Sequence, residues 1–553
     1  MRAKQWRKPC EEGVERVFSV PGSHIHPIYD GISRIPSIRM VTCKMEPNAS
    51  LMADAYGRLT GKPGICIVTA GPGCVNSMAG VAQAYGAASP VVHIGGAVPL
   101  NSPLEPFHGV DDPAFVHEMF KSITKWTMRA ERLAEVPEAM AKAFHIARSG
   151  RPGPVHVELP RVADYSEFIL QEKPEPLPAY KPIPATVMKP DPQDVDRFAE
   201  RLMDAKRPVI AAGKGVIRAG AIADLAALAE QLQAPVVFAQ DTIGVISEDH
   251  PLSAGFISEI QPHPLCTAVL KDADVVLCVG MRMGAAEMVA LTTSVPEDKL
   301  MVAGYDDRKT ELYRGDFRCV TDSKLFFEAL ARRLGNFHAA SKEATINMLA
   351  DGKAEIRRKL AAQNAPHKTD TPIFPGILMD AMNAVLADDA VVASDVGSCQ
   401  MWLRRHRRIV TPESFMQSGG WNAMSYGLPT AMVAKLEFPE RDVIGIAGDG
   451  AFLMTSGDLP TAAEYGANIL MMVLNNGTFG QTFMQQQGFY GHTYGTSFVS
   501  PDFSMMAKAC GCEGIRVSDP TELEDALRQG LQATRQKPVL VEVMTGDHPY
   551  PKI

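Results

Sequence analysis

The sequence predicts an α/β protein made of three doubly wound parallel-sheet domains. Short apolar runs of strand length recur along the chain and alternate with segments of helix length, which is typical of βαβ units. The chain has 553 residues, more than a single hydrophobic core usually supports. A proline-rich stretch at 162–192 and a weakly periodic stretch at about 338–372 are interpreted as linkers. We therefore expect domains at 1–162, 188–338 and 370–550.

The first domain begins with an expected strand at 13–20, which Pro21-Gly22 closes. Pro27 then suits the first turn of a helix. A second helix, with apolar residues at helical spacing, is expected to end near Gly61. The other strands of this domain are expected at 38–42, 63–70, 91–96 and 150–160.

The second and third domains show the same alternation of apolar runs and helical segments. In the second domain, strands are expected at 208–212, 234–238 and 275–279. In the third, a helix is expected at 459–465 and strands at 390–393, 443–447, 469–474 and 539–543. The first and third domains are candidates for the same fold.

Composition narrows the possible partners. The formal net charge of −8 and the pI near 6.0 argue against nucleic acid as the main partner. The densest basic run, Arg404 to Arg408, is interpreted as a solvated helix end. No apolar run reaches the length of a membrane span, and the first residues lack the apolar core of a signal peptide. Because the ten cysteines are scattered, we expect reduced core residues and a cytoplasmic location.

The segment from 441 to 480 carries the clearest chemical signal. Its two expected strands end in Gly448-Asp449-Gly450 and in Asn475-Asn476. In a βαβ unit both strand ends lie at the same sheet edge, where open α/β sheets bind ligands. Asp449 and Asn476 would then offer hard oxygens suited to Mg²⁺ and a phosphorylated ligand. The alternative is that both motifs are ordinary turns.

The order of these two motifs resembles the cofactor motif of thiamine diphosphate (ThDP) enzymes. The resemblance assigns the metal to Asp449, Asn476 and the main-chain carbonyl of Thr478. Further motifs extend it over nearly the whole chain, and they match acetolactate synthases, benzaldehyde lyase and related 2-oxo acid decarboxylases. These motifs are Met45-Glu46 with the following GRLTGKPGICIVTAGPG, GRPGPVHVELP at 150–160, SDVG at 394–397, QMW at 400–402 and SGGWNAMSYGLP at 418–429.

The resemblance also implies roles for residues around the reactive part of the cofactor. Glu46 matches the glutamate that shares a proton with the pyrimidine ring, and burial would favour the protonated carboxyl. Met424 matches the apolar residue over which the cofactor bends, although Met also serves as ordinary core filler. Asn422 stands where the family usually has a glycine whose carbonyl holds the amino group.

The diphosphate is expected at two glycine turns, where backbone N–H groups bind phosphate. The residues implied there are Gly397, Ser398, Cys399, Gly448, Gly450 and Ala451. Ser398 and Cys399 replace a Gln-His pair that contacts the diphosphate in acetolactate synthases.

Three residues are candidates for the substrate side. His24, in PGSHIHP, matches an active-site histidine of benzaldehyde lyase and suits proton transfer, although a helix cap is the alternative. His108 takes the place of a glutamine that lines the site in the family. Gln481 follows the metal loop, where benzaldehyde lyase has a small residue, and would narrow the pocket.

The resemblance implies a ThDP- and Mg²⁺-dependent lyase or carboligase that acts through a C2 carbanion and an enamine. We favour a benzaldehyde-lyase-like activity on 2-hydroxy ketones, aldehydes or 2-oxo acids. The alternatives are an acetolactate-synthase-like or decarboxylase activity. The adjacent His-His pair of pyruvate decarboxylases is missing, and so is the Met-His-Gly flavin element after 251–256, which argues against FAD.

Two other classes fit the sequence less well. A non-catalytic nucleotide- or ThDP-binding protein would need neither Glu46 nor Met424. A nicotinamide dehydrogenase would need GxGxxG after a strand, with an acidic residue about twenty positions on. In the ThDP family the glutamate domain of one subunit meets the metal domain of another, which implies a homodimer or homotetramer with active sites at the interface.

Overall fold

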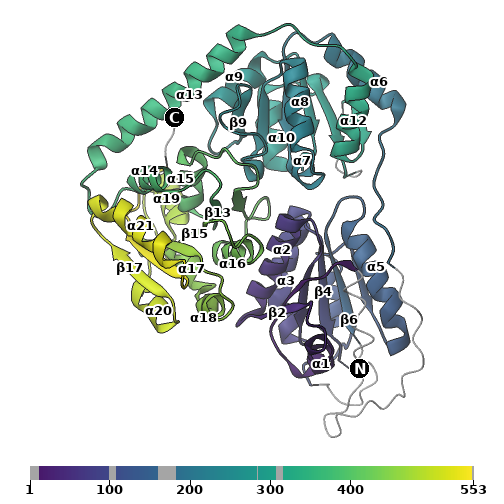
Figure 1. Ribbon diagram of the computed structural model, residues 1–553, viewed down its shortest axis with the longest axis vertical. Helices are drawn as coiled ribbons and strands as arrows, with labels where there is room; N and C mark the ends of the chain where they lie inside the picture. Colours follow the sequence, from purple (N-terminus) through teal and green to yellow (C-terminus); the bar gives the residue numbers. More distant parts are fainter. Residues whose placement is uncertain (1–11, 99–106, 160–181, 283, 307–314, 551–553) are drawn as a thin grey trace.

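The computed structural model describes residues 12–98, 107–159, 182–282, 284–306 and 315–550. Three six-stranded sheets form three lobes that follow one another along the chain (Figure 1). All strand pairs within these sheets are parallel. The expected class, α/β with three doubly wound parallel sheets, is confirmed.

The first sheet has the strand order β2-β1-β3-β4-β6-β5. Its strands are β1 Arg16–Ser19, β2 Arg39–Thr42, β3 Gly64–Val68, β4 Val91–Gly96, β5 Trp126–Arg129 and β6 Pro154–Leu159. Its helices are α1 His26–Ser33, α2 Glu46–Thr60, α3 Pro72–Ala87, α4 Phe115–Phe120 and α5 Val136–Arg148. Gly61 caps α2 with a φ of +69°, a left-handed conformation that glycine adopts without steric cost.

The central sheet has the order β12-β11-β10-β7-β8-β9. Its strands are β7 Pro208–Ala212, β8 Val236–Ala239, β9 Ser253–Ile257, β10 Val275–Val279, β11 Leu300–Gly304 and β12 Phe317–Val320. Its helices are α6 Pro192–Met203, α7 Lys214–Arg218, α8 Ile222–Leu232, α9 Pro264–Asp272, α10 Ala285–Ser294 and α12 Ser323–Leu334. Counted along the domain, this is the doubly wound order 3-2-1-4-5-6.

The third sheet has the order β14-β13-β15-β16-β18-β17. Its strands are β13 Val391–Ser394, β14 Phe415–Gln417, β15 Val443–Gly448, β16 Leu470–Asn475, β17 Glu513–Val517 and β18 Val539–Met544. Its helices are α14 Pro375–Val385, α15 Ser398–His406, α16 Gly427–Glu437, α17 Asp449–Leu453, α18 Leu459–Glu464, α19 Gly480–Tyr490, α20 Phe503–Ala509 and α21 Leu523–Ala533. Counted from its own first strand, this order equals that of the first sheet, so the expected likeness of the two domains is confirmed.

The two expected linkers differ in outcome. The first, at 162–192, lies mainly outside the described residues. The prediction of an irregular linker at 338–372 is wrong for most of its length, because 343–364 form one long helix, α13 Glu343–Asn364. Figure 1 shows α13 running from the central lobe to the third lobe. Only Leu349, Leu360 and Asn364 are buried on it, so the helix lacks the apolar stripe by which sequence patterns reveal helices.

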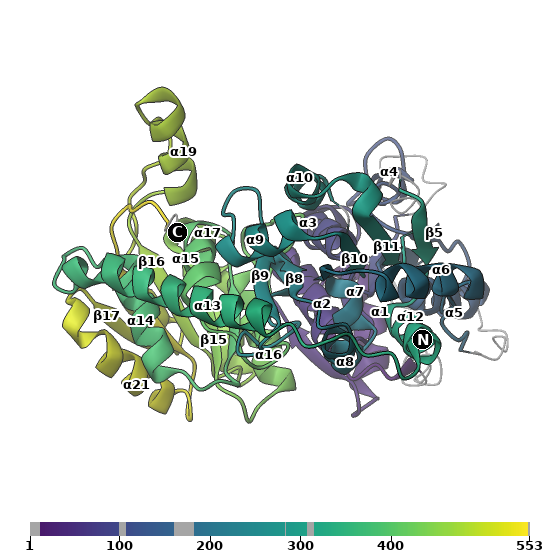
Figure 2. The ribbon, with the colours of Figure 1, turned by 90° about the horizontal axis from the view of Figure 1, so that it is seen from above.

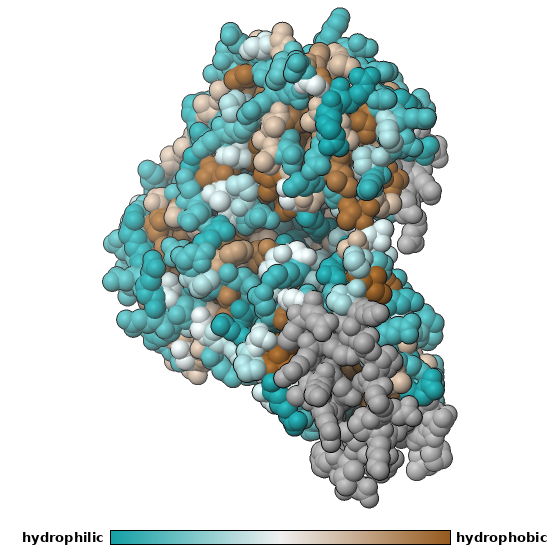
Figure 3. All heavy atoms as spheres, turned by 45° about the vertical axis from the view of Figure 1, so that its right-hand side comes forward, coloured by the Kyte–Doolittle hydropathy of each residue, from teal (hydrophilic) through white to brown (hydrophobic). Residues whose placement is uncertain are grey.

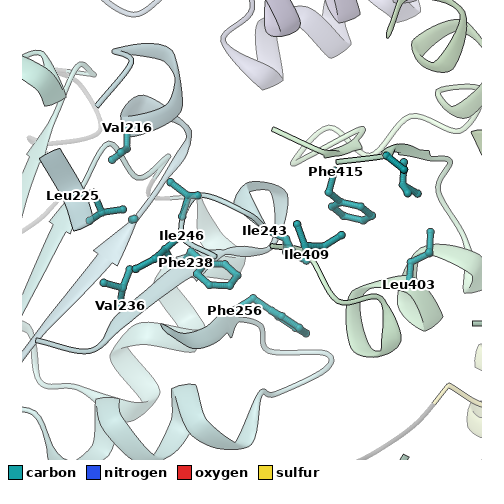
Figure 4. Close-up of a cluster of buried hydrophobic side chains, with 14 of the residues drawn as sticks. Val216, Leu225, Val236, Phe238, Ile243, Ile246, Phe256, Leu403, Ile409 and Phe415 are labelled. Carbon is teal, nitrogen blue, oxygen red and sulfur yellow. The ribbon is translucent and has the colours of Figure 1, made fainter. Parts of the chain in front are cut away.

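The central and third lobes share a hydrophobic core. Figure 4 shows side chains from both lobes, including Ile243 and Ile409, in one buried cluster. The basic run 404–408 enters this joint, which corrects the expectation of a solvated helix end. Arg405 is 7 % exposed, donates from Nη2 to the carbonyl of Pro262 at 2.9 Å and lies over the ring of Phe256. Arg405, His406 and Arg407 are buried because α15 ends against the central lobe, whereas the side chain of Arg408 remains 42 % exposed.

The first and third lobes meet where α2 packs against α16 (Figure 1). Arg58 of α2 is buried there, forms an ion pair of 3.5 Å with Asp54 and donates to the carbonyl of Gln417 at 2.6 Å. Arg16 of β1 pairs with Glu437 of α16 at 2.7 Å. These charged contacts fix the first lobe to the third lobe of the same chain.

A buried pair of histidines links β4 to β6 inside the first lobe. His93 and His156 are register partners, and their Nδ1 atoms lie 2.8 Å apart. The Nε2 atom of His93 lies 2.7 Å from Ser77 Oγ, and the ring of Phe120 stacks on both imidazoles. Burial lowers the pKa of His93 to about 3 and holds the pKa of His156 well below its ordinary value. Both rings are therefore neutral at pH 7.

This pair predicts a loss of stability in mild acid. Unfolding releases both rings to an ordinary pKa near 6.5, so the unfolded chain binds more protons below that pH. The free energy of unfolding has its full value above about pH 6.5. It decreases from there towards pH 3, by about 1.4 kcal/mol per pH unit for each histidine. Urea midpoints at pH 8 and pH 5 measure it. The double variant His93→Leu/His156→Leu is expected to show a smaller drop than the wild type, and equal drops would contradict the prediction.

Residues of different hydropathy are mixed on the outer surface. Figure 3 shows hydrophilic side chains interspersed with small hydrophobic groups over the visible face. Among the described residues, no helix combines the length and apolar character needed to cross a membrane. The nine cysteines in the described residues are all free, and eight of them are buried, as expected for reduced core residues.

Candidate functional site

A cavity of about 490 Å³ lies at the carboxyl edge of the third sheet, and we call it the main cavity because most of the expected cofactor residues line it. Segments that follow five of its parallel strands form the wall, which is the usual ligand position in open α/β sheets. These segments are 396–398 after β13, Asn422 and Met424 after β14, 448–451 after β15, 476–480 after β16 and 545–548 after β18. The side chains of α19 add the outer part.

Asp449 lies at the base of this cavity and is completely buried. Its Oδ1 accepts from the N–H of Gly450 at 2.8 Å, and its Oδ2 accepts from the N–H of Gly477 at 2.6 Å and of Asn476 at 3.1 Å. Burial raises the pKa of this carboxyl, and the N–H donors oppose that effect. The sheet therefore brings the two expected metal ligands, Asp449 and Asn476, to one place.

The donor set at this place suits a hard divalent cation. Asp449 and the side chain of Asn476 supply oxygen ligands, and Thr478 follows on the same loop and lines the same cavity. Within the described parts of the chain, no group of three or more His, Cys, Asp or Glu side chains forms a metal site. The set therefore leaves coordination positions for phosphate oxygens and water, as Mg²⁺ prefers.

Two residues that contact the expected metal ligands were not predicted from the sequence. Ser500 donates from Oγ to Asp449 Oδ2 at 3.0 Å. Asp547 accepts from Asn476 Nδ2 at 2.8 Å and from Thr478 Oγ1 at 2.7 Å. Neither lies in a recognisable motif. The signal for Asp547 is its position directly after the apolar run 539–544, because a parallel strand there must end at the same sheet edge.

The glycine turns expected for the diphosphate line the cavity, together with Ser398 and Ala451. A Cβ at position 450 would lie 2.5 Å from the ring of Phe479, so that turn requires glycine. Cys399 is the exception. Its side chain is 1 % exposed, its Sγ faces the carbonyl of Asp395 at 3.6 Å, and it does not line the cavity. The Cys399 thiol is therefore directed away from the expected diphosphate position.

Asn422 and Met424 both line the cavity from the loop after β14. Asn422 has a φ of +60°, a left-handed conformation in which Asn is the best-tolerated replacement for glycine. Met424 is 41 % exposed within one chain, which argues against the alternative that it fills a core. An exposed thioether on a cavity wall fits the expected apolar support for a bent ligand.

Gln481 reaches the cavity from the first turn of α19. Figure 2 shows α19 projecting from the third lobe, and none of its residues is buried. Met484, Gln485 and Gln486 of the same helix also line the cavity. Gln481 therefore stands with other long side chains on the outer wall, as the expected narrowing of the pocket requires.

The other three candidates lie in the first lobe, around the start of α3. The rings of His24 and His108 are 5.0 Å apart, and Thr69 Oγ1 lies 3.4 Å from His24 Nδ1. A Cβ on Gly73 would lie 2.9 Å from Thr69 and 3.6 Å from Glu46 Oε1. The fold thus gathers Glu46, His24 and His108 at the carboxyl edge of the first sheet.

Glu46 begins α2, where a carboxylate is favoured by the helix N-terminus. Its Oε2 accepts from Asn76 Nδ2 at 3.2 Å. It is only half-buried, whereas the sequence predicts a buried carboxyl. Met45 and Val75, at the starts of α2 and α3 on this side of the first lobe, are also exposed within a single chain.

One chain therefore contains two half-sites. Among the described residues that line the main cavity, all belong to the third lobe, and Glu46, His24 and His108 are not among them. The first half-site carries titratable groups suited to proton transfer, and the second carries oxygen ligands and glycine turns suited to a metal diphosphate.

Comparison with known proteins matches all three lobes. Residues 10–119 match the thiamine pyrophosphate enzyme N-terminal TPP binding domain, residues 195–330 the central domain, and residues 395–543 the C-terminal TPP binding domain.

Similar proteins span almost the whole chain. A probable acetolactate synthase large subunit of Methanocaldococcus jannaschii is 31 % identical over 96 % of this chain and 90 % of its own length. An acetolactate synthase large subunit of Mycobacterium tuberculosis is 30 % identical over 97 % and 86 %. The large subunit of acetolactate synthase isozyme 3 of Escherichia coli is 29 % identical over 99 % and 95 %.

Proposed function

The chain belongs to the acetolactate synthase family of ThDP-dependent enzymes, and from that premise we propose that it is a carboligase that joins two 2-oxo acids with loss of CO₂. The similarity to acetolactate synthases over nearly the full length carries this proposal. It favours the acetolactate-synthase-like alternative over the benzaldehyde-lyase-like activity that the sequence motifs favour. In the simplest case two pyruvate ions and one proton give acetolactate and CO₂.

When bound, ThDP supplies a carbanion that attacks a carbonyl carbon. Asp449, Asn476 and the Thr478 carbonyl would hold Mg²⁺ and, through it, the diphosphate. The glycine turns at 397 and 450 would add N–H donors, and Met424 would support the bent cofactor. Glu46 would hold a proton at the pyrimidine end, and His24 and His108 would exchange protons with substrate oxygens.

We further propose that the active site forms between two copies of the chain. Within the described residues the main cavity has no wall from the first lobe, and Glu46 is only half-buried in a single chain. Pairing the two half-sites across a subunit interface would bury Glu46 and complete the cavity.

The proposed reaction includes no step through FAD. The cavity between the first and central lobes, beside Lys214, Arg218 and Arg282, has a volume of only about 50 Å³. Pockets that enclose drug-sized ligands have roughly 300–1,000 Å³. This small volume supports a reaction without a flavin dinucleotide, and the purified protein is expected to show no flavin absorption.

The proposed function predicts acetolactate from pyruvate, with a requirement for both ThDP and Mg²⁺. The protein is incubated with pyruvate, with pyruvate plus 2-oxobutyrate, with benzoylformate and with benzoin in parallel, and the products are identified by NMR. Release of an aldehyde alone would replace the proposal by a decarboxylase. Cleavage of benzoin without acetolactate formation would restore the lyase interpretation.

A further inference from the structure

The main cavity has very little positive charge for a site that takes a diphosphate. Its described wall contains two carboxylates, Asp449 and Asp547, but no Lys or Arg. His548 is the one basic residue that lines it in the described parts of the chain. Of the two side chains after Gly397, Ser398 adds a hydroxyl to the wall. The thiol of Cys399 is buried and does not reach the cavity.

His548 lies in the short segment Gly546–His548 after β18. This segment starts beside the loop 476–480, which contains the expected metal ligands Asn476 and Thr478. The two lie together because β18 pairs with β16, and the N–H of Thr545 donates to the carbonyl of Asn475 at 3.0 Å. The imidazole packs edge-to-face on Phe374 with ring centres 4.9 Å apart. Phe374 packs in turn on Trp402 of α15, the helix whose N-terminus borders the cavity. The ring is therefore held on the cavity wall.

Asp547 acts on the metal loop from the same segment. Its Oδ1 accepts from both Asn476 Nδ2 and Thr478 Oγ1. An ionised carboxylate only accepts hydrogen bonds, so the amide nitrogen of Asn476 must face Asp547. The amide oxygen of Asn476 is then directed away from Asp547. It accepts from the N–H of Thr478 at 3.2 Å, and its second lone pair remains available for a metal.

We propose that the segment Gly546–His548 completes the diphosphate end of the cofactor site. His548 donates a hydrogen bond to a diphosphate oxygen, and Asp547 is a positioning residue that fixes the Asn476 amide for the metal. The inference rests on the proposed function, because it takes Mg²⁺ and ThDP as the ligands. It makes the last segment after β18 a third part of the site, beside the two glycine turns.

The test compares ligands that differ in their phosphate groups. Dissociation constants of Mg²⁺-ThDP, Mg²⁺-pyrophosphate and thiamine are measured by calorimetry on the full chain, without any assay of turnover. His548→Ala is expected to weaken ThDP and pyrophosphate about tenfold, the effect of one lost charge-assisted hydrogen bond, and to leave thiamine unchanged. His548→Gln is expected to recover part of the loss, because its amide still donates.

His367→Ala is the matched control for packing. His367 also stacks on Phe374, with ring centres 4.1 Å apart, but pairs with Asp370 and does not line the cavity. It is expected to leave all three constants unchanged. For Asp547→Asn, the Mg²⁺ concentration that half-saturates ThDP binding is expected to rise about tenfold.

Each outcome decides the inference. A folded His548→Ala variant that binds pyrophosphate within twofold of the wild type would overturn it. If the alanine variant does not fold, His548→Gln replaces it: weaker binding of pyrophosphate supports the inference, and unchanged binding overturns it. An equal loss in His367→Ala would overturn it as well, because packing would then explain the effect. If the wild type binds Mg²⁺-ThDP but makes no acetolactate, only the proposed reaction fails. If it binds neither cofactor nor pyrophosphate, both proposals fail.

Discussion

Replacing Glu46 by alanine is expected to lower kcat about a hundredfold to ten-thousandfold, while the affinity for Mg²⁺-ThDP stays within a few-fold of the wild type. The carboxyl is the one acidic group placed at the start of α2 beside Asn76, at the carboxyl edge of the first sheet. It is remote in sequence from the glycine turns that we expect to bind the diphosphate, so its loss is expected to remove proton transfer rather than cofactor binding. Turnover of pyruvate and calorimetric binding of ThDP measure the two quantities separately.

Two further variants distinguish a proton-transfer role from a structural one. Glu46→Gln keeps the size and hydrogen-bonding ability of the side chain but has no acidic proton, so it is expected to lose as much activity as alanine. Glu15→Ala is the control, because Glu15 is an exposed carboxylate of the same lobe that pairs with Lys62. Near-normal kcat in Glu46→Ala, or recovery in Glu46→Gln, would contradict the assignment.

The strands that the sequence predicts well are those buried on both faces. The limits of β4, β7 and β10 agree with the expected runs at 91–96, 208–212 and 275–279. Helices cover both faces of these sheets, so each central strand is a continuous apolar run that ends sharply. The chain pattern is sufficient for these three strands, whereas β11, which is also buried along its whole length, was missed.

Of the six edge strands only β2 was predicted, and three of the others were missed for the opposite reason. β5, Trp126–Arg129, has no fully buried residue, and β12 and β17 mix buried with exposed positions. Half-exposed strands of four or five residues do not differ from loops in composition. Their position in the sheet depends on contacts with strands that are distant in sequence, which a local pattern does not contain.

The candidate site also divides into residues that the sequence predicts and residues that only the structure reveals. The turns at 397 and 450, Asp449 and Asn476 lie in sequence motifs, and the cavity contains all of them. Asp547 and Ser500 contact this cluster from segments with no motif, and the separation of the two half-sites depends on how the lobes pack. The buried state of Arg405 is similar, because only the joint with the central lobe explains it.

Replacing Asp449 is expected to weaken the Mg²⁺-dependent binding of ThDP at least about a hundredfold. The carboxylate is the one charged side chain among the expected metal ligands, so its removal deprives the site of the attraction that holds a hard dication. Asp449→Ala also leaves the N–H groups of Gly450, Asn476 and Gly477 without an acceptor. Each unpaired buried donor costs about 1–3 kcal/mol, so this variant is expected to lose stability as well.

Asp449→Asn separates the two effects, because it keeps the shape and one acceptor oxygen but removes the charge. The increase in Tm on adding Mg²⁺-ThDP measures the ligand effect, and the Tm without ligand measures the fold. For Asp449→Asn we expect little of that increase and a smaller loss of Tm than for Asp449→Ala. Ser500→Ala removes a single donor to the same carboxylate and is expected to weaken ThDP only a few-fold. An undiminished increase in Asp449→Asn would mean that the metal lies elsewhere, because no other ligand in the expected set supplies the charge.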